Sequence, residues 1–338
     1  MFLNPAKLFF LTSLMLSTLI VMSSSSWFSA WIALEINLLS FIPLISNTSN
    51  VLSSEAALKY FLTQAMASAV LLLFILFNQM SINFMPFMTN PHYCNLLLSS
   101  PLLLKLGAAP FHFWFPSIME GLDWFSCFIL MTWQKIAPMI ILFNILTMVS
   151  FFLMVMTSSV MVGSWGGLNQ ISLRKLMAYS SITHIGWMLA AMAYNINILV
   201  SLSSYMLYPN SSNNSCLLEK KSFPILKQMF FSSLNPTFSI IMFSGILSLG
   251  GLPPFLGFLP KWLVIQSLTY ENPFLITMMV ILTLMTLFFY MRLSFTAFLM
   301  FYPSNKWFIE WSNSAMLLII SSTIIFLLPV ISIIPFNL

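Results

Sequence analysis

Four ionisable residues of this 338-residue sequence lie within stretches that are otherwise apolar: Glu35, Lys105, Lys135 and Lys261. An ionisable side chain near the centre of a bilayer costs about 2.5–3.5 kcal/mol. Together the four cost on the order of 10 kcal/mol before any pairing is counted. Because carboxylates and amines can each take up and release a proton, charges kept at this cost indicate a series of proton carriers inside a membrane.

Each of the three lysines has a proline close to it in the sequence. The pairs are Lys105 with Pro110, Lys135 with Pro138, and Lys261 with Pro260. A proline inside a helix removes one backbone hydrogen bond and leaves a carbonyl without its donor. Such a carbonyl is tolerated at membrane depth only against protein or a water-filled cavity. The sequence therefore predicts a hydrated helix defect beside each buried lysine.

Structural roles for the four charges remain open at this stage. A lysine near a helix end can extend its ammonium to the headgroups. Its position in the sequence excludes this role for Lys135, partly allows it for Lys105 and leaves it open for Lys261. Glu35 can serve as the structural partner of a neighbouring lysine, and such a role is compatible with proton transfer.

Two histidines are further candidates for the same path. His112 follows Pro110 and is either a proton relay after Lys105 or a hydrogen-bonded core histidine. His184 ends a segment rich in hydroxyl groups, residues 179–184, and either lines a water path or bonds a neighbouring helix.

The composition requires a membrane to hold these residues in place. Only 12 Lys or Arg and 7 Asp or Glu occur in the chain, 6% of its residues, whereas 59% are hydrophobic and mean hydropathy is +0.96. Too few charges are present to cover a soluble surface, so we expect an all-α polytopic membrane protein. About 20 apolar residues span a bilayer. On that length the sequence predicts eleven helices, at 4–24, 27–46, 55–78, 96–119, 124–146, 148–166, 173–193, 195–208, 236–268, 274–300 and 314–334.

These helices are expected to form one transmembrane domain over 1–338, with repeat halves at 1–146 and 148–300 and a C-terminal helix at 314–334. The repeat rests on Leu106-Gly107-x-x-Pro110 and Pro110-Phe111-x4-Pro116. These recur as Leu249-Gly250-x-x-Pro253 and Pro254-Phe255-x4-Pro260, about 143 residues later and with one insertion. Broken helices at corresponding places in two halves are typical of transporters with an ion path near the midplane.

The remaining basic residues predict the topology. With eleven crossings, and 236–268 counted as one broken helix, all of them lie on the side of the N-terminus. They are Lys7, Lys59, Arg174, Lys175, Lys220, Lys221, Lys227, Arg292 and Lys306. The N-terminus is therefore expected inside and the C-terminus outside.

Several function classes are disfavoured. No basic run exceeds two residues, so the net charge of +5 does not indicate nucleic-acid binding. Cys94, Cys127 and Cys216 are isolated from one another, and no nucleotide-binding or metal-binding motif occurs. We expect neither a metal nor another cofactor on this chain.

The sequence resembles the NADH–ubiquinone oxidoreductase chain 2 family, in an insect-like form, over essentially its whole length. The specific segments are 105–114, 132–138, 166–170, 174–181 and 251–262. The resemblance implies an antiporter-like, proton-pumping subunit of respiratory complex I in the mitochondrial inner membrane, with the N-terminus in the matrix and the C-terminus in the intermembrane space. It further implies an obligate hetero-oligomer with other membrane-arm subunits, in which quinone is reduced elsewhere and this chain has no redox centre. Animal members lack three N-terminal helices of their bacterial relatives, in keeping with a count of eleven.

The same resemblance implies a role for each buried charge. Glu35 would pair with Lys105, Lys135 would be the central proton carrier, and Lys261 would lead towards the exit. Two other functions are weighed against this one. A stand-alone antiporter would exchange cations for protons without partners, and a structural subunit would only hold its neighbours together, although such a scaffold needs no buried lysines.

Overall fold

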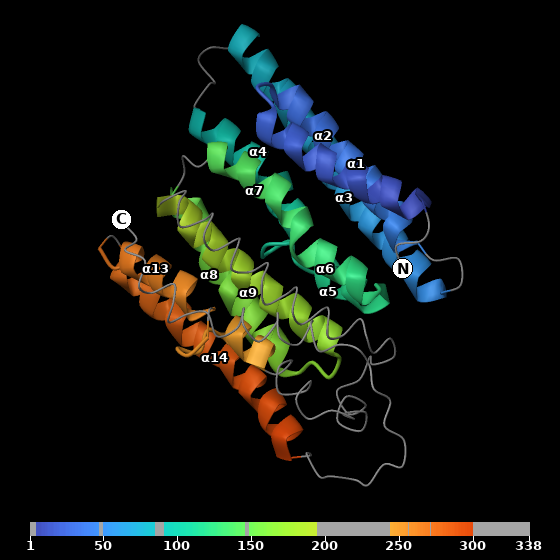
Figure 1. Ribbon diagram of the computed structural model, residues 1–338. Coiled ribbons are helices and arrows are strands. Elements are labelled where there is room, and N and C mark those ends of the chain that lie inside the picture. The colour runs from blue at the N-terminus through green and yellow to red at the C-terminus, as the bar shows by residue number, and fades with distance from the viewer. Residues whose placement is uncertain are drawn as a thin grey trace. The chain divides into compact units, whose positions relative to one another are not determined.

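The computed structural model describes residues 5–46, 50–84, 91–145, 149–194, 244–255, 257–270 and 272–299. The elements in these ranges are α-helices, which confirms the predicted fold class. They are α1 (Pro5–Ser23), α2 (Trp27–Ile45), α3 (Val51–Phe84), α4 (Pro91–Leu106), α5 (Trp114–Gly121), α6 (Trp124–Met131), α7 (Trp133–Ile145), α8 (Val149–Leu168), α9 (Leu173–Tyr194), α13 (Phe258–Leu268) and α14 (Pro273–Leu299) (Figure 1). The predicted helices 195–208 and 314–334 lie outside the described residues.

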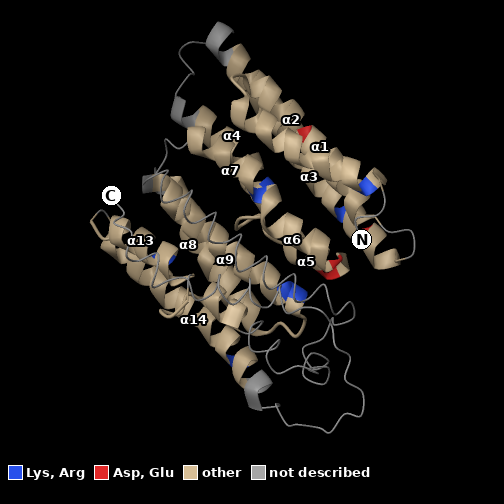
Figure 2. Cartoon of the chain, in the orientation of Figure 1, with Lys and Arg blue, Asp and Glu red and all other residues tan. Residues whose placement is uncertain are grey.

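Six spans in the described part of the chain are long and apolar enough to cross a membrane. Charged residues are sparse along their ribbons (Figure 2). Large apolar side chains point outward on several of them, as Phe274, Met278, Ile281 and Phe288 do on α14. Their spacing places them along one side of the helix. Such a surface is suited to lipid tails or to the apolar face of another membrane protein.

The chain divides into two compact units, residues 1–159 and 160–338. In the first unit α1 packs against α2, α2 against α3, and α3 against both α4 and α5. Helix α7 packs against α1, α2, α4 and α6 and so joins the helices that carry Glu35 and Lys105. Lipid tails are as apolar as leucine, so the hydrophobic effect does not drive membrane helices together. Close packing of their side chains holds them together instead.

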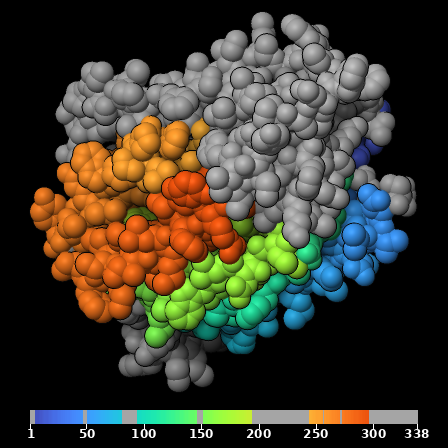
Figure 3. All heavy atoms as spheres, turned by 90° about the horizontal axis from the view of Figure 1, so that it is seen from below, coloured from blue at the N-terminus to red at the C-terminus, as the bar shows by residue number. Residues whose placement is uncertain are grey.

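In the second unit α13 packs against α9 and α14, and Figure 3 shows the atoms of α13 and α14 side by side in orange. Gly163 and Gly166 of α8 face Thr183 and Tyr179 of α9, and a Cβ at either glycine would overlap these side chains. Small residues let membrane helices approach closely in this way.

Three predicted helices are interrupted. Segment 96–119 consists of α4 and α5, and segment 124–146 consists of α6 and α7, which are separated at Thr132. A proline ring displaces the carbonyl four residues earlier. For Pro138 this is the carbonyl of Gln134, yet α7 runs on through Pro138, and the interruption lies before it, at Thr132. In the described part of 236–268, residues 244–250 and α13 are helical on either side of a break.

Two of the breaks correspond, and they correct the predicted alignment of the repeat. Helix α4 ends at residue 106 and α5 begins at 114, while the later helices end at 250 and begin at 258, each 144 residues further on. Gly107 and Gly251 both have positive φ, +75° and +84°, directly after the helix end. Glycine adopts this conformation without steric cost. Gly251, rather than Gly250, is therefore the counterpart of Gly107, and no insertion is needed.

Candidate functional site

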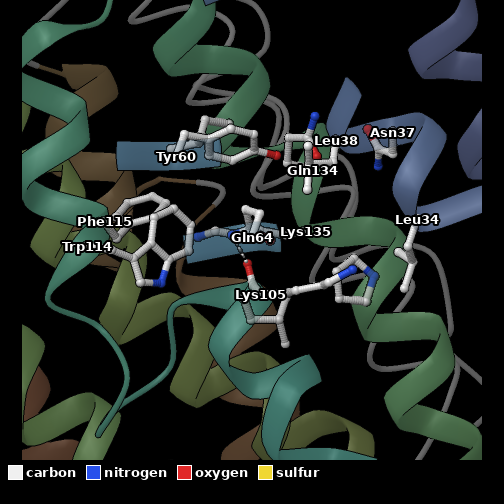
Figure 4. A pocket seen from close by; sticks show the side chains of 13 residues that line it. Leu34, Asn37, Leu38, Tyr60, Gln64, Lys105, Trp114, Phe115, Gln134 and Lys135 are labelled. Carbon is white, nitrogen blue, oxygen red and sulfur yellow. Dashed lines mark hydrogen bonds between the residues drawn. The ribbon is translucent and has the colours of Figure 1, made fainter. Parts of the chain in front are cut away.

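Lys105 and Lys135 line one cavity in the first unit (Figure 4). The volume open to the centres of water molecules is about 20 Å³. A volume of this size has room for about one water. Five helices besides α4 contribute side chains. The lining residues are Leu34, Asn37, Leu38, Tyr60, Gln64, Lys105, Leu106, Trp114, Phe115, Leu130, Gln134, Lys135 and Pro138.

Lys105 lies in the last turn of α4 and is 8% exposed. The chain leaves the helix at Gly107, whose backbone N–H still donates to the carbonyl of Leu104 at 3.1 Å. Side chains add donors at this helix end: the indole Nε1 of Trp114 donates to the carbonyl of Leu104 at 3.0 Å, and Nε2 of Gln64 donates to the carbonyl of Lys105 at 3.4 Å. The break is thereby fixed in a position that holds Lys105 at the cavity.

Lys135 is in the first turn of α7 and is 6% exposed. Its Nζ lies 5.4 Å from the centroid of the Phe115 ring. A cation over an aromatic face gains about 0.5–2 kcal/mol. The Phe115 ring, which belongs to α5, therefore stabilises the ammonium of Lys135 at one side of the cavity.

Glu35 is half-buried on α2 and acts electrostatically on Lys105. The two side chains form no ion pair, because no oxygen of Glu35 lies within 4.0 Å of the ammonium of Lys105. Glu35 is also not among the residues that line the cavity. The carboxylate is thus within range of Lys105 but separated from it.

Lys261 belongs to the second unit and is 7% exposed. Its Nζ donates to the carbonyls of Leu249 at 3.1 Å and Gly250 at 2.8 Å. These carbonyls end the helical segment 244–250, at the break that corresponds to the one after α4. An ammonium at a helix C-terminus is favoured by both the free carbonyls and the helix dipole. The ammonium is therefore bound to the carbonyls that the helix break after Gly250 exposes. A hydrated defect at Pro260, which lies inside α13, stays a prediction.

The two histidines do not line the cavity shared by Lys105 and Lys135. Nδ1 of His112 lies 3.2 Å from the carbonyl of Pro110. Because a carbonyl can only accept, this nitrogen carries the proton and donates it. His112 is thus a hydrogen-bonded histidine within the break. His184 is buried on α9 in the second unit. A relay role for either residue stays a prediction.

Three amides and three aromatic residues of the site were not predicted as site residues from the sequence. Asn37, Gln64 and Gln134 each interrupt an apolar segment and line the cavity. Tyr60, Trp114 and Phe115 line it too. Burying an amide without a partner is also costly, so the rule that singled out the charges would have found these three amides. The aromatic residues gave no such signal, since membrane helices contain many of them.

Comparisons with known proteins agree with this architecture. Residues 24–286 match the family model described as NADH:quinone oxidoreductase/Mrp antiporter, transmembrane, and residues 287–335 match NADH dehydrogenase subunit 2 C-terminus. NADH-ubiquinone oxidoreductase chain 2 of Anopheles gambiae is 50% identical over 307 residues, covering 89% of this chain and 88% of the relative.

The same protein of Aedes aegypti is 49% identical over 324 residues, covering 94% of this chain and 93% of the relative. A chain of respiratory complex I from Thermus thermophilus with bound aureothin has a similar fold, with a TM-score of 0.83 at 23% identity over 97% of this chain and 79% of that one. At these levels of identity and coverage, the chain belongs to the NADH-ubiquinone oxidoreductase chain 2 family.

Proposed function

We propose that this chain is an antiporter-like subunit of respiratory complex I that carries protons across the mitochondrial inner membrane. Quinone reduction in other subunits would drive it, and this chain would hold no redox centre. The observation that carries the proposal is the water-sized cavity that Lys105 and Lys135 share, beside the helix breaks after Leu106 and at Thr132. The family model supports it, since it unites NADH:quinone oxidoreductases with Mrp antiporters.

The proposed switch is electrostatic and starts at Glu35. When its carboxylate approaches Lys105, the ammonium of Lys105 is held charged and its field on Lys135 is largely cancelled. When the two separate, Lys105 repels the proton on Lys135 and drives it onward. Two unit charges about 4 Å apart interact by about 4 kcal/mol at an effective dielectric of about 20, enough to move a proton between carriers. The present separation of Glu35 from Lys105 fits the second state.

Lys261 is proposed to pass the proton towards the exit, and its position depends on Gly251. A Cβ on this glycine would lie 3.0 Å from Nζ of Lys261, and φ there is +84°. Gly251→Ala should therefore cost about 1–2 kcal/mol in backbone strain and push the ammonium off its two carbonyls. We expect lower thermal stability and a several-fold slower proton translocation in the assembled complex.

Gly250→Ala is the matched control for Gly251→Ala. The φ of Gly250 is not positive, and a Cβ added to Gly250 would contact only Tyr290, at 3.3 Å. Both variants are compared by thermal unfolding of the purified complex and by proton release per NADH. Equal effects of the two variants would contradict the role given to Gly251.

The exposed surface of the chain is suited to a lipid bilayer and to other membrane subunits. Apolar side chains exposed on α1, α3 and α14 suit lipid tails and the apolar faces of other membrane-arm subunits. We propose an obligate hetero-oligomer with such subunits and no contact with nucleic acid. In this assembly NADH oxidation and quinone reduction belong to the partner chains, so no cofactor is assigned to this one.

A vesicle experiment separates this function from a stand-alone antiporter. Complex I containing the chain should release protons when NADH is oxidised, whereas the chain reconstituted alone should stay inactive under a Na⁺ or K⁺ gradient. Acidification by the isolated chain under a cation gradient would instead establish the antiporter function.

The proposed orientation has the N-terminus in the matrix and the C-terminus in the intermembrane space. It rests on the basic residues that the predicted topology places on one side of the membrane. Those in described helices are Lys7, Lys59, Arg174, Lys175 and Arg292. A protease-cleavable tag at the C-terminus should be cut in mitochondria whose outer membrane alone has been opened. Cleavage only after the inner membrane is also opened would reverse the assignment.

A further inference from the structure

We propose that the first unit binds a zwitterionic phospholipid with a primary amine, of the phosphatidylethanolamine class, in a second cavity at the boundary between hydrocarbon and headgroups. The headgroup phosphate pairs with Lys7, the headgroup ammonium pairs with Asp123, and part of one acyl chain fills the cavity. This site goes beyond the proposed function, because it requires only that the chain spans a lipid bilayer and holds whether or not the chain carries protons.

The first observation is an apolar cavity that shares no lining residue with the cavity of the two lysines. The volume open to the centres of water molecules is about 150 Å³. Its apolar lining consists of Leu8, Leu11, Leu44 and Phe125. An apolar cavity of about 150 Å³ binds a molecule the size of benzene, so this one has room for about six carbons of an acyl chain.

The second observation is that the cavity lies where three apolar helices begin or end. Lys7 is in the first turn of α1, Leu44 is in the last turn of α2, and Asp123 directly precedes α6. The spans Pro5–Ser23, Trp27–Ile45 and Trp124–Ile145 are each long and apolar enough to cross a membrane. Their ends therefore mark the depth at which a phospholipid passes from acyl chain to headgroup. Leu8 is 53% exposed, so the cavity lies at the surface, where lipid reaches it.

The third observation is that the cavity is lined by one charge of each sign. Lys7 and Asp123 are both half-buried. Asp123 is the N-cap residue of α6, but its side chain makes no capping hydrogen bond to that helix. A zwitterionic headgroup has a phosphate and a cationic nitrogen only a few bonds apart. Such a headgroup therefore offers an oppositely charged partner to each of the two residues.

The two charges discriminate among phospholipid headgroups. Basic pockets between membrane helices are typical sites for anionic lipids. In this cavity the carboxylate of Asp123 repels a headgroup that is only negative. Choline is positively charged but has no N–H group and cannot donate a hydrogen bond to the carboxylate. The ammonium of ethanolamine has three N–H donors, and a hydrogen bond between two charged groups is about twice as strong as one between neutral groups.

A lipid in this position joins helices that are far apart in the sequence. Its acyl chain packs against α1, α2 and α6, and its headgroup links Lys7 to Asp123. A ligand that binds only the folded protein stabilises the folded state. The lipid is therefore a structural ligand that holds these three helix ends together.

Photolabelling of assembled complex I tests the site. The probe is phosphatidylethanolamine with a photoreactive diazirine in one acyl chain, in nanodiscs whose bilayer is phosphatidylcholine. Mass spectrometry of the digested chain should find the label on the peptides that contain Leu8, Leu11 and Phe125, although phosphatidylcholine is in excess. Unlabelled phosphatidylethanolamine should lower this labelling about tenfold, whereas the same amount of phosphatidylglycerol should lower it little.

Three variants remove one feature of the site at a time. Lys7→Gln and Asp123→Asn should each lower labelling about tenfold, and asparagine is an equally good N-cap for α6. In Asp123→Asn, phosphatidylglycerol should also become an effective competitor, because the repelling carboxylate is gone. Leu11→Phe keeps both charges but narrows the cavity, so it should lower labelling as well.

Glu55→Gln and Lys59→Gln are the matched controls. They remove the same two kinds of charge from an ion pair on α3 that does not line the cavity, and should leave labelling unchanged. Native gel electrophoresis establishes that each variant is assembled. The competition between lipids uses the wild-type complex alone, so it decides the matter even where a substitution prevents assembly.

Four results would overturn the inference. They are absence of label from the cavity peptides, equal competition by phosphatidylglycerol in the wild type, unchanged labelling of both Lys7→Gln and Asp123→Asn, and a cryo-EM map of the complex in which a side chain of a neighbouring subunit fills the cavity. Each of them leaves the proposed function untouched, since proton translocation is measured separately in the same preparations.

Discussion

Lys135→Met is expected to lower the rate of proton translocation in assembled complex I about a hundredfold. The side chain of Lys135 is buried, and methionine has a similar length and suits an apolar setting, so the fold should persist. The variant has no group that can bind a proton between Lys105 and the remainder of the path. Loss of a positioned acid–base group costs about 10²–10⁴ in rate. Proton release per NADH in vesicles measures the effect.

Two further variants serve as comparisons for Lys135→Met. Lys135→Arg keeps the positive charge, but a guanidinium does not release its proton in a protein, so we expect a comparable loss. Lys59→Met removes a lysine whose side chain is 54% exposed and should leave proton translocation unchanged. Normal pumping by Lys135→Arg would show that the site needs a charge rather than a proton carrier.

Glu35→Gln and Lys105→Met are each expected to slow coupled turnover about tenfold, and the double variant should be no slower than the slower single variant. Glu35 acts electrostatically on Lys105, and the proposed switch requires both charges. Residues that act as one unit have strongly non-additive effects. A double-mutant cycle on NADH oxidation by coupled vesicles measures the interaction.

The chain contains its own control for this cycle. Glu55 and Lys59 form an ion pair of 3.7 Å on α3, with side chains 58% and 54% exposed. Exposed pairs contribute about 0–1 kcal/mol, so Glu55→Gln, Lys59→Met and their combination should leave turnover almost unchanged. Strictly additive effects at Glu35 and Lys105 would mean that the two residues work independently, contrary to the switch.

The helix breaks show how far local chemistry predicts this fold. Gly107 and Gly251 terminate helices because both adopt positive φ, and the glycine–proline pattern in the sequence indicates both breaks. The break at Thr132 was not predicted at that residue. A proline indicates a disturbance of the helix, but the helix continues through Pro138 and is interrupted six residues earlier, so the proline did not locate the break.

The sequence by itself determined the membrane location, the helical class, the two breaks that begin at Gly107 and Gly251, and the cost of four charges in apolar segments, because composition and local backbone chemistry decide these. Only the tertiary structure decided that Lys105 and Lys135 share a cavity with Asn37 and Gln134, that Glu35 stands apart from Lys105, and that Lys261 binds its own broken helix. The physical reason is the solvent. In water an apolar stripe shows which side of a helix faces inward, but in lipid both the interior and the surroundings are apolar, so the sequence does not reveal which side chains meet.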